Sequence, residues 1–377
     1  MSHPPISIQD YRRAVALRDL TDPSLGPHAL QLLIRAITAA LVDRWGCALV
    51  THRANPVIPI EDNYDRLHYP PDGAARDARY TRYVSERLLL RTMTTALVPD
   101  VLQRLAREGL DDVLVACPGL VYRRDAIDRL HTGEPHQLDL WRVRRGEALG
   151  VEDLEEMIAL VVEACLPGAE HRTLPARHPY TSNGLQIDVR DGGARATADW
   201  VEVGECGLAL PDLLRDNGLD PSSASGLAMG LGLDRILMLR KGIDDIRLLR
   251  ASAARVSAQM LDLEPYRPVS MQPPIRRDLS LAVAEGLTGE ELGDRVRTAL
   301  GDEARSIETV EVLSETPYAA LPDPAKQRLG IRAGQKNVLV RVVLRDHDRT
   351  LTHAEANRLR DRIYGALHQG SLHEWAR

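Results

Sequence analysis

The larger, N-terminal part of the chain mixes helical and strand-like patterns of hydrophobic positions. Segments 27–45, 92–108 and 151–164 carry apolar residues at helical spacing and are predicted to be helices. Segments 112–122 and 137–143 are predicted to be strands that flank a charged loop. Because helices and strands do not alternate regularly, the pattern predicts an α+β fold rather than a doubly wound sheet. The clearest apolar stripe consists of Leu30, Leu33, Ile34, Ile37 and Leu41.

A proline-rich segment separates this part from the C-terminal part. Residues 264–274 contain four prolines, and proline removes a backbone donor and fixes φ, so a linker is predicted here. We therefore expect one domain over residues 1–263 and a second over residues 275–377.

The C-terminal part has the pattern of a small α+β domain. Two sequences typical of a capping box, Thr288 with Glu291 and Thr352 with Glu355, each begin a predicted helix. Placed between the expected strands, these helices give the order βαββαβ, which is the ferredoxin-like split motif. The expected strands cover 278–284, 307–313, 337–344 and 371–375.

Composition indicates an ordinary globular protein. Hydrophobic residues make up 44% of the 377 residues and charged residues 27%, which excludes a disordered chain. The sequence has no run of about 18 apolar residues and no apolar centre of a signal peptide near its start, so we expect a cytoplasmic protein without a membrane segment. The four cysteines lie far apart without a CxxC pair, which argues against a zinc knuckle or a disulfide framework.

Phenylalanine is absent from the chain. Average usage would give roughly a dozen in a protein of this length. Ten tyrosines are present although their codons are similar, so codon bias alone does not explain the absence.

Positive charge is concentrated near the C-terminus. From residue 265 on there are seventeen basic and sixteen acidic residues, against thirty-one and thirty-eight before it. Basic residues gather in segment 326–349, as expected of a surface that meets phosphates. Solvated strand edges, which are often charged, are the alternative explanation.

Three local clusters carry candidate chemistry. Arg123 follows a predicted strand and could offer its planar guanidinium to a carboxylate or phosphate, although surface charge is the simpler explanation. Small residues at 225–232 permit close approach to the backbone and precede Arg235, which could hold a polyphosphate or pair with a neighbouring aspartate. Glu202 lies in an apolar strand, which favours a salt bridge or a magnesium ligand.

Together these clusters resemble motifs 2 and 3 of class II aminoacyl-tRNA synthetases, and specifically the catalytic subunit of phenylalanyl-tRNA synthetase. The C-terminal part resembles the ferredoxin-like anticodon-binding domain of that enzyme, and the fusion of the two resembles the single-chain organellar form. The matching segments are LLLRTMTT (88–95), PGLVYRRDAID (118–128), HQLD (136–139), WVEVGECG (200–207), SGLAMGLGLDRILMLRKGIDDIRLL (225–249), PPIRRDLSLAV (273–283) and DRTLTHAEANRLRDRI (348–363).

The resemblance implies ATP and Mg as cofactors and implies a role for individual residues. Arg123 would bind the α-phosphate and the amino-acid carboxylate, and Asp125 would close motif 2. His131 and Arg235 would hold the outer phosphates, and Glu202 a magnesium ion. The implied amino-acid-binding residues are Tyr83, Met93, Thr95, Gln137, Asp139, His178, Tyr180 and Ala228, and the implied tRNA-binding residues are Arg276, Arg277, Lys336 and Arg349.

The expected amino-acid pocket departs from the family pattern. Met93 replaces a histidine, Asp139 a glutamate, and Ser182 a glutamate that contributes to magnesium binding. His178 and Tyr180 replace two phenylalanines that contact the substrate ring, and both are rings that can still make edge-to-face contacts.

The expected function is ATP-dependent activation of phenylalanine and its transfer to tRNA by a backup or resistance enzyme whose own message needs no phenylalanine codons. Two alternatives remain open: an adenylate-forming enzyme for another amino acid, and an inactive synthetase-like tRNA-binding regulator. The expected partners are tRNA and the amino acid, without DNA or membrane, and the protein would be a monomer or a homodimer.

Overall fold

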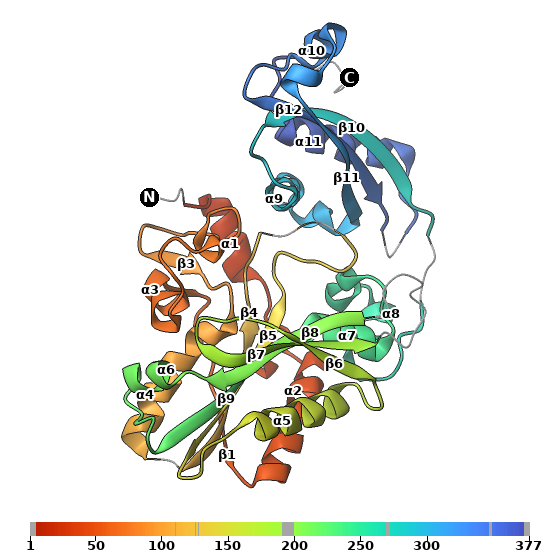
Figure 1. Cartoon of the computed structure of the whole chain (residues 1–377). Coiled ribbons are helices and arrows are strands. Elements are labelled where there is room, and N and C mark those ends of the chain that lie inside the picture. Colours follow the sequence, from red (N-terminus) through yellow and green to blue (C-terminus); the bar gives the residue numbers. More distant parts are fainter. Residues whose placement is uncertain are drawn as a thin grey trace. The chain divides into compact units, whose positions relative to one another are not determined.

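The computed structural model describes residues 5–109, 111–124, 126, 128–190, 200–268, 272–346 and 349–372. The chain divides into two compact units (Figure 1). The first contains residues up to Arg123, Glu134–Asp244 and Ala258–Tyr266. The second contains Arg124–Gly133, Asp245–Ser257 and the residues from Arg267 on.

A seven-stranded sheet forms the centre of the first unit. Only its edge pair β1–β4 is parallel, and every other neighbouring pair is antiparallel. This confirms the α+β class and the antiparallel sheet expected for the first domain. In spatial order the strands are β1 (Ala48–Thr51), β4 (Asp112–Leu120), β5 (His136–Arg145), β9 (Ala224–Gly232), β8 (Trp200–Ala209), β7 (Thr181–Arg190) and β6 (His171–Pro175).

Helices cover both faces of this sheet. On one face α2 (Ala29–Trp45) packs against α5 (Val151–Cys165) and α7 (Leu233–Lys241) (Figure 1). The predicted stripe of α2 faces this packing, since Leu30, Leu33, Ile37 and Leu41 are fully buried while Ile34 is only partly buried. The opposite face packs against α4 (Val98–Glu108) and α6 (Pro211–Asp216). The unit also contains α1 (Ile8–Ala16), α3 (Ile60–Asn63), β2 (Val57–Pro59) and β3 (Leu88–Leu90).

The predicted helix at 92–108 is wrong in its first part. Residues Thr94–Leu97 form a 3-10 turn, and the α-helix α4 begins only at Val98. Pro99 explains the boundary because proline lacks an N–H and is accommodated only in the first turn of a helix. The strand predicted at 112–122 ends at Leu120 in β4.

The second unit is built around a three-stranded antiparallel sheet in the order β10–β12–β11. Helices α9 and α11 pack against each other, and both predicted capping boxes form at their starts. These boxes join Thr288 with Glu291 and Thr352 with Glu355. The elements are α8 (Ala254–Ser257), β10 (Ile275–Ala284), α9 (Gly289–Leu300), β11 (Ile307–Pro317), α10 (Asp323–Leu329), β12 (Gln335–Leu344) and α11 (His353–Leu367).

The second unit differs from the sequence prediction in two places. The short helix α10 between β11 and β12 was not predicted. The strand expected at 371–375 does not begin at Ser371 or Leu372, and residues 373–377 lie outside the described part of the chain. Among the described residues of either unit, no helix is long and apolar enough to cross a membrane.

Candidate active site

The candidate site of the first unit is built on one row of residues across the central sheet. Glu205 of β8, Gly230 of β9, Asp139 of β5 and Cys117 of β4 are register partners, and directly opposite residues of paired strands point to the same face. A Cβ added at Gly230 would lie 3.6 Å from the Asp139 carboxylate. The small residues of β9 therefore form an open floor between the carboxylates of Asp139 and Glu205.

Asp139 is a buried carboxylate that is held by three side-chain donors. Its Oδ2 accepts from the Thr95 hydroxyl at 2.8 Å and from the Thr94 hydroxyl at 3.2 Å, and its Oδ1 accepts from the Trp141 indole at 3.1 Å. Only 3% of Asp139 is exposed, and this burial raises its pKa to about 6 although all three donors lower it. A cationic group brought to this carboxylate would be strongly favoured.

The segment that supplies these hydroxyls also holds two other predicted residues. The backbone N–H of Thr94 donates to the Gln137 side chain at 3.3 Å. The carbonyl of Thr92 accepts from Nε of Arg123 at 2.8 Å. Residues 92–95 thus connect Arg123, Gln137 and Asp139, three of the residues predicted to bind substrate.

Aromatic side chains gather beside Asp139. The Tyr180 ring lies 5.5 Å from the His178 ring, 6.1 Å from Trp141 and 6.2 Å from Tyr69. Burial raises the pKa of Tyr180 well above its ordinary value, and Tyr69 and Asp139 act in the same direction. Ala228, the register partner of Trp141, is also buried here. The sheet face therefore combines a carboxylate with an aromatic wall.

Both ring nitrogens of His178 have partners. Nδ1 lies 2.9 Å from the Thr181 hydroxyl, and Nε2 lies 3.0 Å from the Glu205 carboxylate. The same pair holds the pKa of Glu205 below its ordinary value. With its polar edge occupied in this way, the imidazole stacks on Tyr180 through its flat face.

A bulge in β8 brings two carboxylates to one face. The register shifts between the pairs Ile187–Gly204 and Asp188–Glu202, so that Glu202 and Glu205 are exposed while Val203 and Gly204 between them are buried. Burial and the nearby Glu205 raise the pKa of Glu202, and Arg235 and Arg123 oppose this rise. The predicted salt bridge does not form, since Glu202 makes no ion pair among the described residues.

The Glu202 carboxylate suits a magnesium ion that is bound together with a nucleotide. Mg²⁺ is usually held by one or two carboxylates plus substrate phosphates rather than by an all-protein cage. The described residues contain no cluster of three or more His, Cys, Asp or Glu side chains that could hold a metal alone. Arg235 is fixed beside this site, because its Nη1 donates to the Glu202 carbonyl at 3.0 Å.

The start of α7 is anchored to β5. Asp234 accepts from the backbone N–H of His136, and its other oxygen lies 2.8 Å from the His136 ring. Both residues are buried, so this contact sets where Arg235 leaves the helix.

Among the described residues predicted for catalysis or substrate binding, Tyr83 and His131 are not part of this cluster. The Tyr83 hydroxyl donates to the Arg76 carbonyl at 2.5 Å, and Tyr83 lies in the hydrophobic cluster beneath the site. His131 belongs to the second unit, where its ring lies 2.7 Å from Asp128. Asp125 lies outside the described residues.

The loop that carries His131 is attached within the second unit. Arg297 of α9 donates to the Ala126 carbonyl at 2.7 Å, and Arg129 lies 3.3 Å from the buried Glu308. Arg124 lies 3.7 Å from Asp294. Residues 124, 126 and 129 thus contact α9 and Glu308 of the same unit.

The predicted tRNA-binding residues differ in whether their side chains already form ion pairs. Lys336 pairs with Glu315 at 2.8 Å, and Arg349 pairs with Glu355 at 2.7 Å. Arg277 bonds Asn357 of α11. The exposed cations of this domain that make no ion pair within its described part include Arg276, Arg328 and Arg332.

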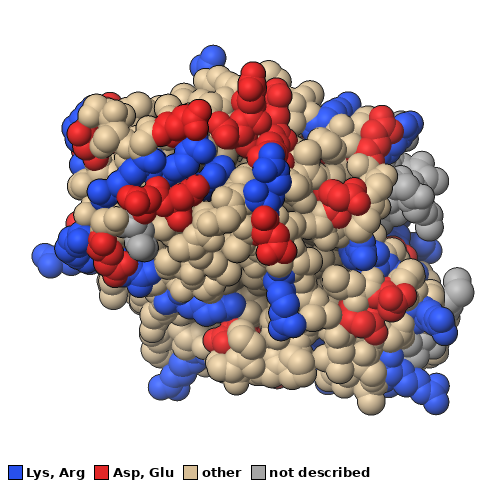
Figure 2. Space-filling model, turned by 90° about the horizontal axis from the view of Figure 1, so that it is seen from below, with Lys and Arg blue, Asp and Glu red and all other residues tan. Residues whose placement is uncertain are grey.

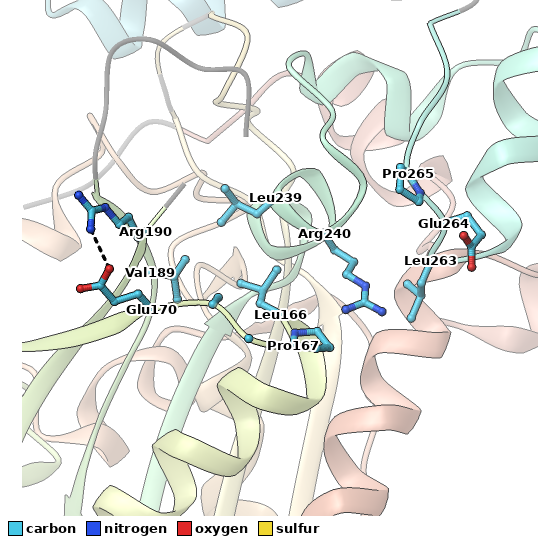
Figure 3. A pocket seen from close by; sticks show the side chains of 12 residues that line it. Leu166, Pro167, Glu170, Val189, Arg190, Leu239, Arg240, Leu263, Glu264 and Pro265 are labelled. Carbon is cyan, nitrogen blue, oxygen red and sulfur yellow. Dashed lines mark hydrogen bonds and ion pairs between the residues drawn. The ribbon is translucent and has the colours of Figure 1, made fainter. Parts of the chain in front are cut away.

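Two further surface features lie outside the candidate site. The face in Figure 2 carries acidic and basic side chains intermixed over its described residues, so it offers no continuous basic area for RNA. A pocket of about 640 Å³ lies at the ends of α5, β7 and α7 (Figure 3), and no predicted site residue lines it. Its lining includes Leu166, Val189, Leu239, Leu263, Arg240 and the ion pair between Glu170 and Arg190.

Sequence reasoning missed the residues that act through other residues. Asn63 and Tyr69 contact the site but come from segments that carry no motif of their own. Thr94 and Glu205 lie inside the matching segments 88–95 and 200–207, yet no role was assigned to them there. The spacing of Glu205 from Glu202 gave no signal, because strand alternation without a bulge places residues three apart on opposite faces.

The chain matches the family model described as "tRNA synthetases class II core domain (F)" over residues 28–260, and the model "Ferredoxin-fold anticodon binding domain" over residues 270–372. The chain therefore belongs to the class II tRNA synthetase core-domain family, and it carries a ferredoxin-fold domain after that core. This confirms the fold expected for both parts.

Proteins that are similar in sequence to this chain include phenylalanine–tRNA ligase alpha subunits. That of Prochlorococcus marinus (strain MIT 9313) is 36% identical over 52% of this chain and 56% of its own length. That of Bacillus subtilis (strain 168) is 29% identical over 62% of this chain and 68% of its own. The chain spans little more than half the length of the first relative. A solved pyrrolysyl tRNA synthetase, Desulfitobacterium hafniense PylSc, covers 60% of this chain at 19% identity and a TM-score of 0.45.

The raised pKa of Asp139 makes the stability of the protein depend on pH. The folded carboxyl holds its proton more tightly than the unfolded one, so stability falls as the pH rises from about 4 to about 6. The effect amounts to roughly 3 kcal/mol. Because Asp139→Asn cannot ionise, its stability relative to wild type should improve by about this amount between pH 4 and pH 7. Urea unfolding at both pH values measures this, and parallel pH profiles would contradict it.

Proposed function

We propose that this protein activates phenylalanine with ATP and transfers it to tRNA, as a single-chain synthetase. The observation that carries the proposal is the aromatic wall of Tyr180, His178 and Trp141 beside the buried carboxylate of Asp139. A site that binds an aromatic amino acid must supply a carboxylate to pair with the ammonium group and an apolar surface to contact the aromatic ring. The site offers both on one sheet face.

The cationic residues around this face supply what adenylate formation requires. The reaction joins the amino-acid carboxylate to the α-phosphorus of ATP and releases pyrophosphate, and it depends on positioning and charge stabilisation rather than on a covalent intermediate. Arg123 would bind the α-phosphate and the carboxylate, and Arg235 the outer phosphates. Glu202 would hold a magnesium ion, which supplies neutralisation of phosphate charge.

The pocket argues for phenylalanine over a polar amino acid. His178 is the residue that most suggests altered specificity, yet Thr181 and Glu205 occupy both of its nitrogens. Its remaining exposed surface is the ring, which suits an apolar aromatic side chain.

The absence of phenylalanine supports a specialised role. A message without phenylalanine codons could be translated when charged phenylalanyl-tRNA is scarce, or when another such enzyme is blocked. The protein would then act as a backup or resistance enzyme.

ATP–pyrophosphate exchange with each of the amino acids tests the proposal directly. Exchange with phenylalanine supports it. Exchange with a different amino acid would favour the adenylate-forming alternative, and no exchange with any amino acid would favour the tRNA-binding regulator.

Removing either of the arginines that we propose bind phosphate should strongly impair activation. We expect Arg123→Ala and Arg235→Ala each to reduce exchange by about 10²–10³-fold, as loss of one charge-stabilising donor does. Arg215→Ala removes an arginine that pairs with Asp212 at the surface and serves as the control. Activity within tenfold of wild type in either site variant would contradict the assignment.

Restoring phenylalanine to the pocket should not change the substrate. In the double variant His178→Phe, Tyr180→Phe, the ring surfaces are kept and the polar atoms are lost, so phenylalanine should remain preferred with only modestly altered efficiency. An apolar pocket discriminates an added polar group by about 10²-fold or less. The exchange assay measures this, and a double variant that gains phenylalanine from no activity would contradict the prediction.

The unpaired cations of the second unit should carry most of the tRNA contact. We expect Arg328→Gln with Arg332→Gln to weaken tRNA binding and to flatten its salt dependence, by about 0.7–0.9 in log–log slope for each phosphate that is no longer neutralised. Exchange activity should not change. Lys336→Gln removes a cation that already pairs with Glu315 and should have a smaller effect. Equal effects of the two variants in a filter-binding titration would speak against this distinction.

A further inference from the structure

Asn63 is a fully buried polar residue at the end of α3. Its side-chain Nδ2 donates to the Thr92 hydroxyl at 2.8 Å, and its Oδ1 accepts from the Thr92 backbone N–H at 3.0 Å. Helix α3 contacts β2 and the 3-10 turn that follows Thr92. The amide therefore makes two hydrogen bonds to a single residue.

Thr92 needs these bonds because it lies between regular elements. It follows β3, which ends at Leu90, and precedes the 3-10 turn that begins at Thr94. Neither a strand ladder nor a helix fixes its backbone, and a buried N–H must find a partner. The Asn63 amide supplies that partner and also donates to the Thr92 hydroxyl, so it holds Thr92 at both its backbone N–H and its side chain.

The backbone carbonyl of Thr92 holds the arginine that is predicted to bind phosphate. The Thr92 carbonyl accepts from Nε of Arg123 at 2.8 Å. Arg123 is exposed and makes no ion pair among the described residues, so this carbonyl is the contact that orients its guanidinium. The remaining guanidinium nitrogens stay available for phosphate or carboxylate oxygens.

We propose that Asn63 is a positioning residue for Arg123 and acts through Thr92. The inference rests on the proposed function, in which Arg123 binds the α-phosphate. Asn63 itself touches no substrate. Its effect is on the direction of the guanidinium, and a misplacement of about 1 Å in such a group can reduce a rate by 10²-fold.

The test compares Asn63→Ala with Asn217→Ala. Asn217 is an equally suitable buried asparagine of the same unit, 3% exposed, whose amide donates to the Leu213 carbonyl and to no site residue. We expect Asn63→Ala to lower kcat/KM for ATP in the exchange assay by about 10–100-fold. Asn217→Ala should stay within about threefold of wild type at a similar loss of thermal stability.

A double-mutant cycle separates positioning from simple destabilisation. If Asn63 acts through Arg123, adding Asn63→Ala to Arg123→Ala should cause no further loss of kcat/KM for ATP, because the group it orients is gone. Losses that multiply in the double variant would overturn the proposal. So would equal losses in Asn63→Ala and Asn217→Ala.

A second variant keeps the test valid if Asn63→Ala does not fold. Thr92→Val keeps the volume of the side chain and removes its hydroxyl, and it should show the same epistasis with Arg123→Ala. Equilibrium dialysis with ATP alone measures binding in all variants without any amino acid. If wild type exchanges with no amino acid, the proposed function fails. Even then, weaker ATP binding by Asn63→Ala than by Asn217→Ala supports the positioning role. Equal ATP binding by these two variants overturns it.

Discussion

The buried carboxylate of Asp139 is the constraint on which the candidate site depends. A charged group that is 3% exposed is costly unless it is hydrogen-bonded, and here the bonds come from Thr94, Thr95 and Trp141. Because two of these donors belong to one 3-10 turn, the turn must stay against β5. The same segment carries the Thr92 carbonyl that accepts from Arg123, so satisfying the carboxylate also sets the position of the cation that we propose binds phosphate.

The small residues of β9 follow from the same constraint. Asp139 and Glu205 lie on either side of Gly230 in one row, and a larger side chain there would fill the space between the two carboxylates. Gly204 has a separate reason, since a Cβ would come within 2.4 Å of the Gly230 carbonyl. Glycine therefore permits close strand packing at one position and an open floor at the other.

Local pattern predicted the elements of this protein better than the partners of its site residues. The strand predicted at 137–143 forms within β5, and the capping boxes at Thr288 and Thr352 began helices as expected. Asn63 was not predictable in this way, because its partner Thr92 is distant in the sequence and carries no signal of burial. The bulge at Val203 was equally silent, since an extra residue in a strand changes the facing of Glu202 without changing the composition.

A chain without phenylalanine must build its aromatic wall from rings that carry polar atoms, and each such atom needs a partner when it is buried. At His178 the partners are Thr181 and Glu205, so replacing an apolar ring by imidazole involves three positions rather than one. The size of the ring matters less than the hydrogen bonds, because an imidazole with a free nitrogen would present a polar edge to the substrate. The wall at His178 therefore depends on the Glu205 carboxylate, which occupies one ring nitrogen and so keeps the polar edge of the imidazole away from the substrate.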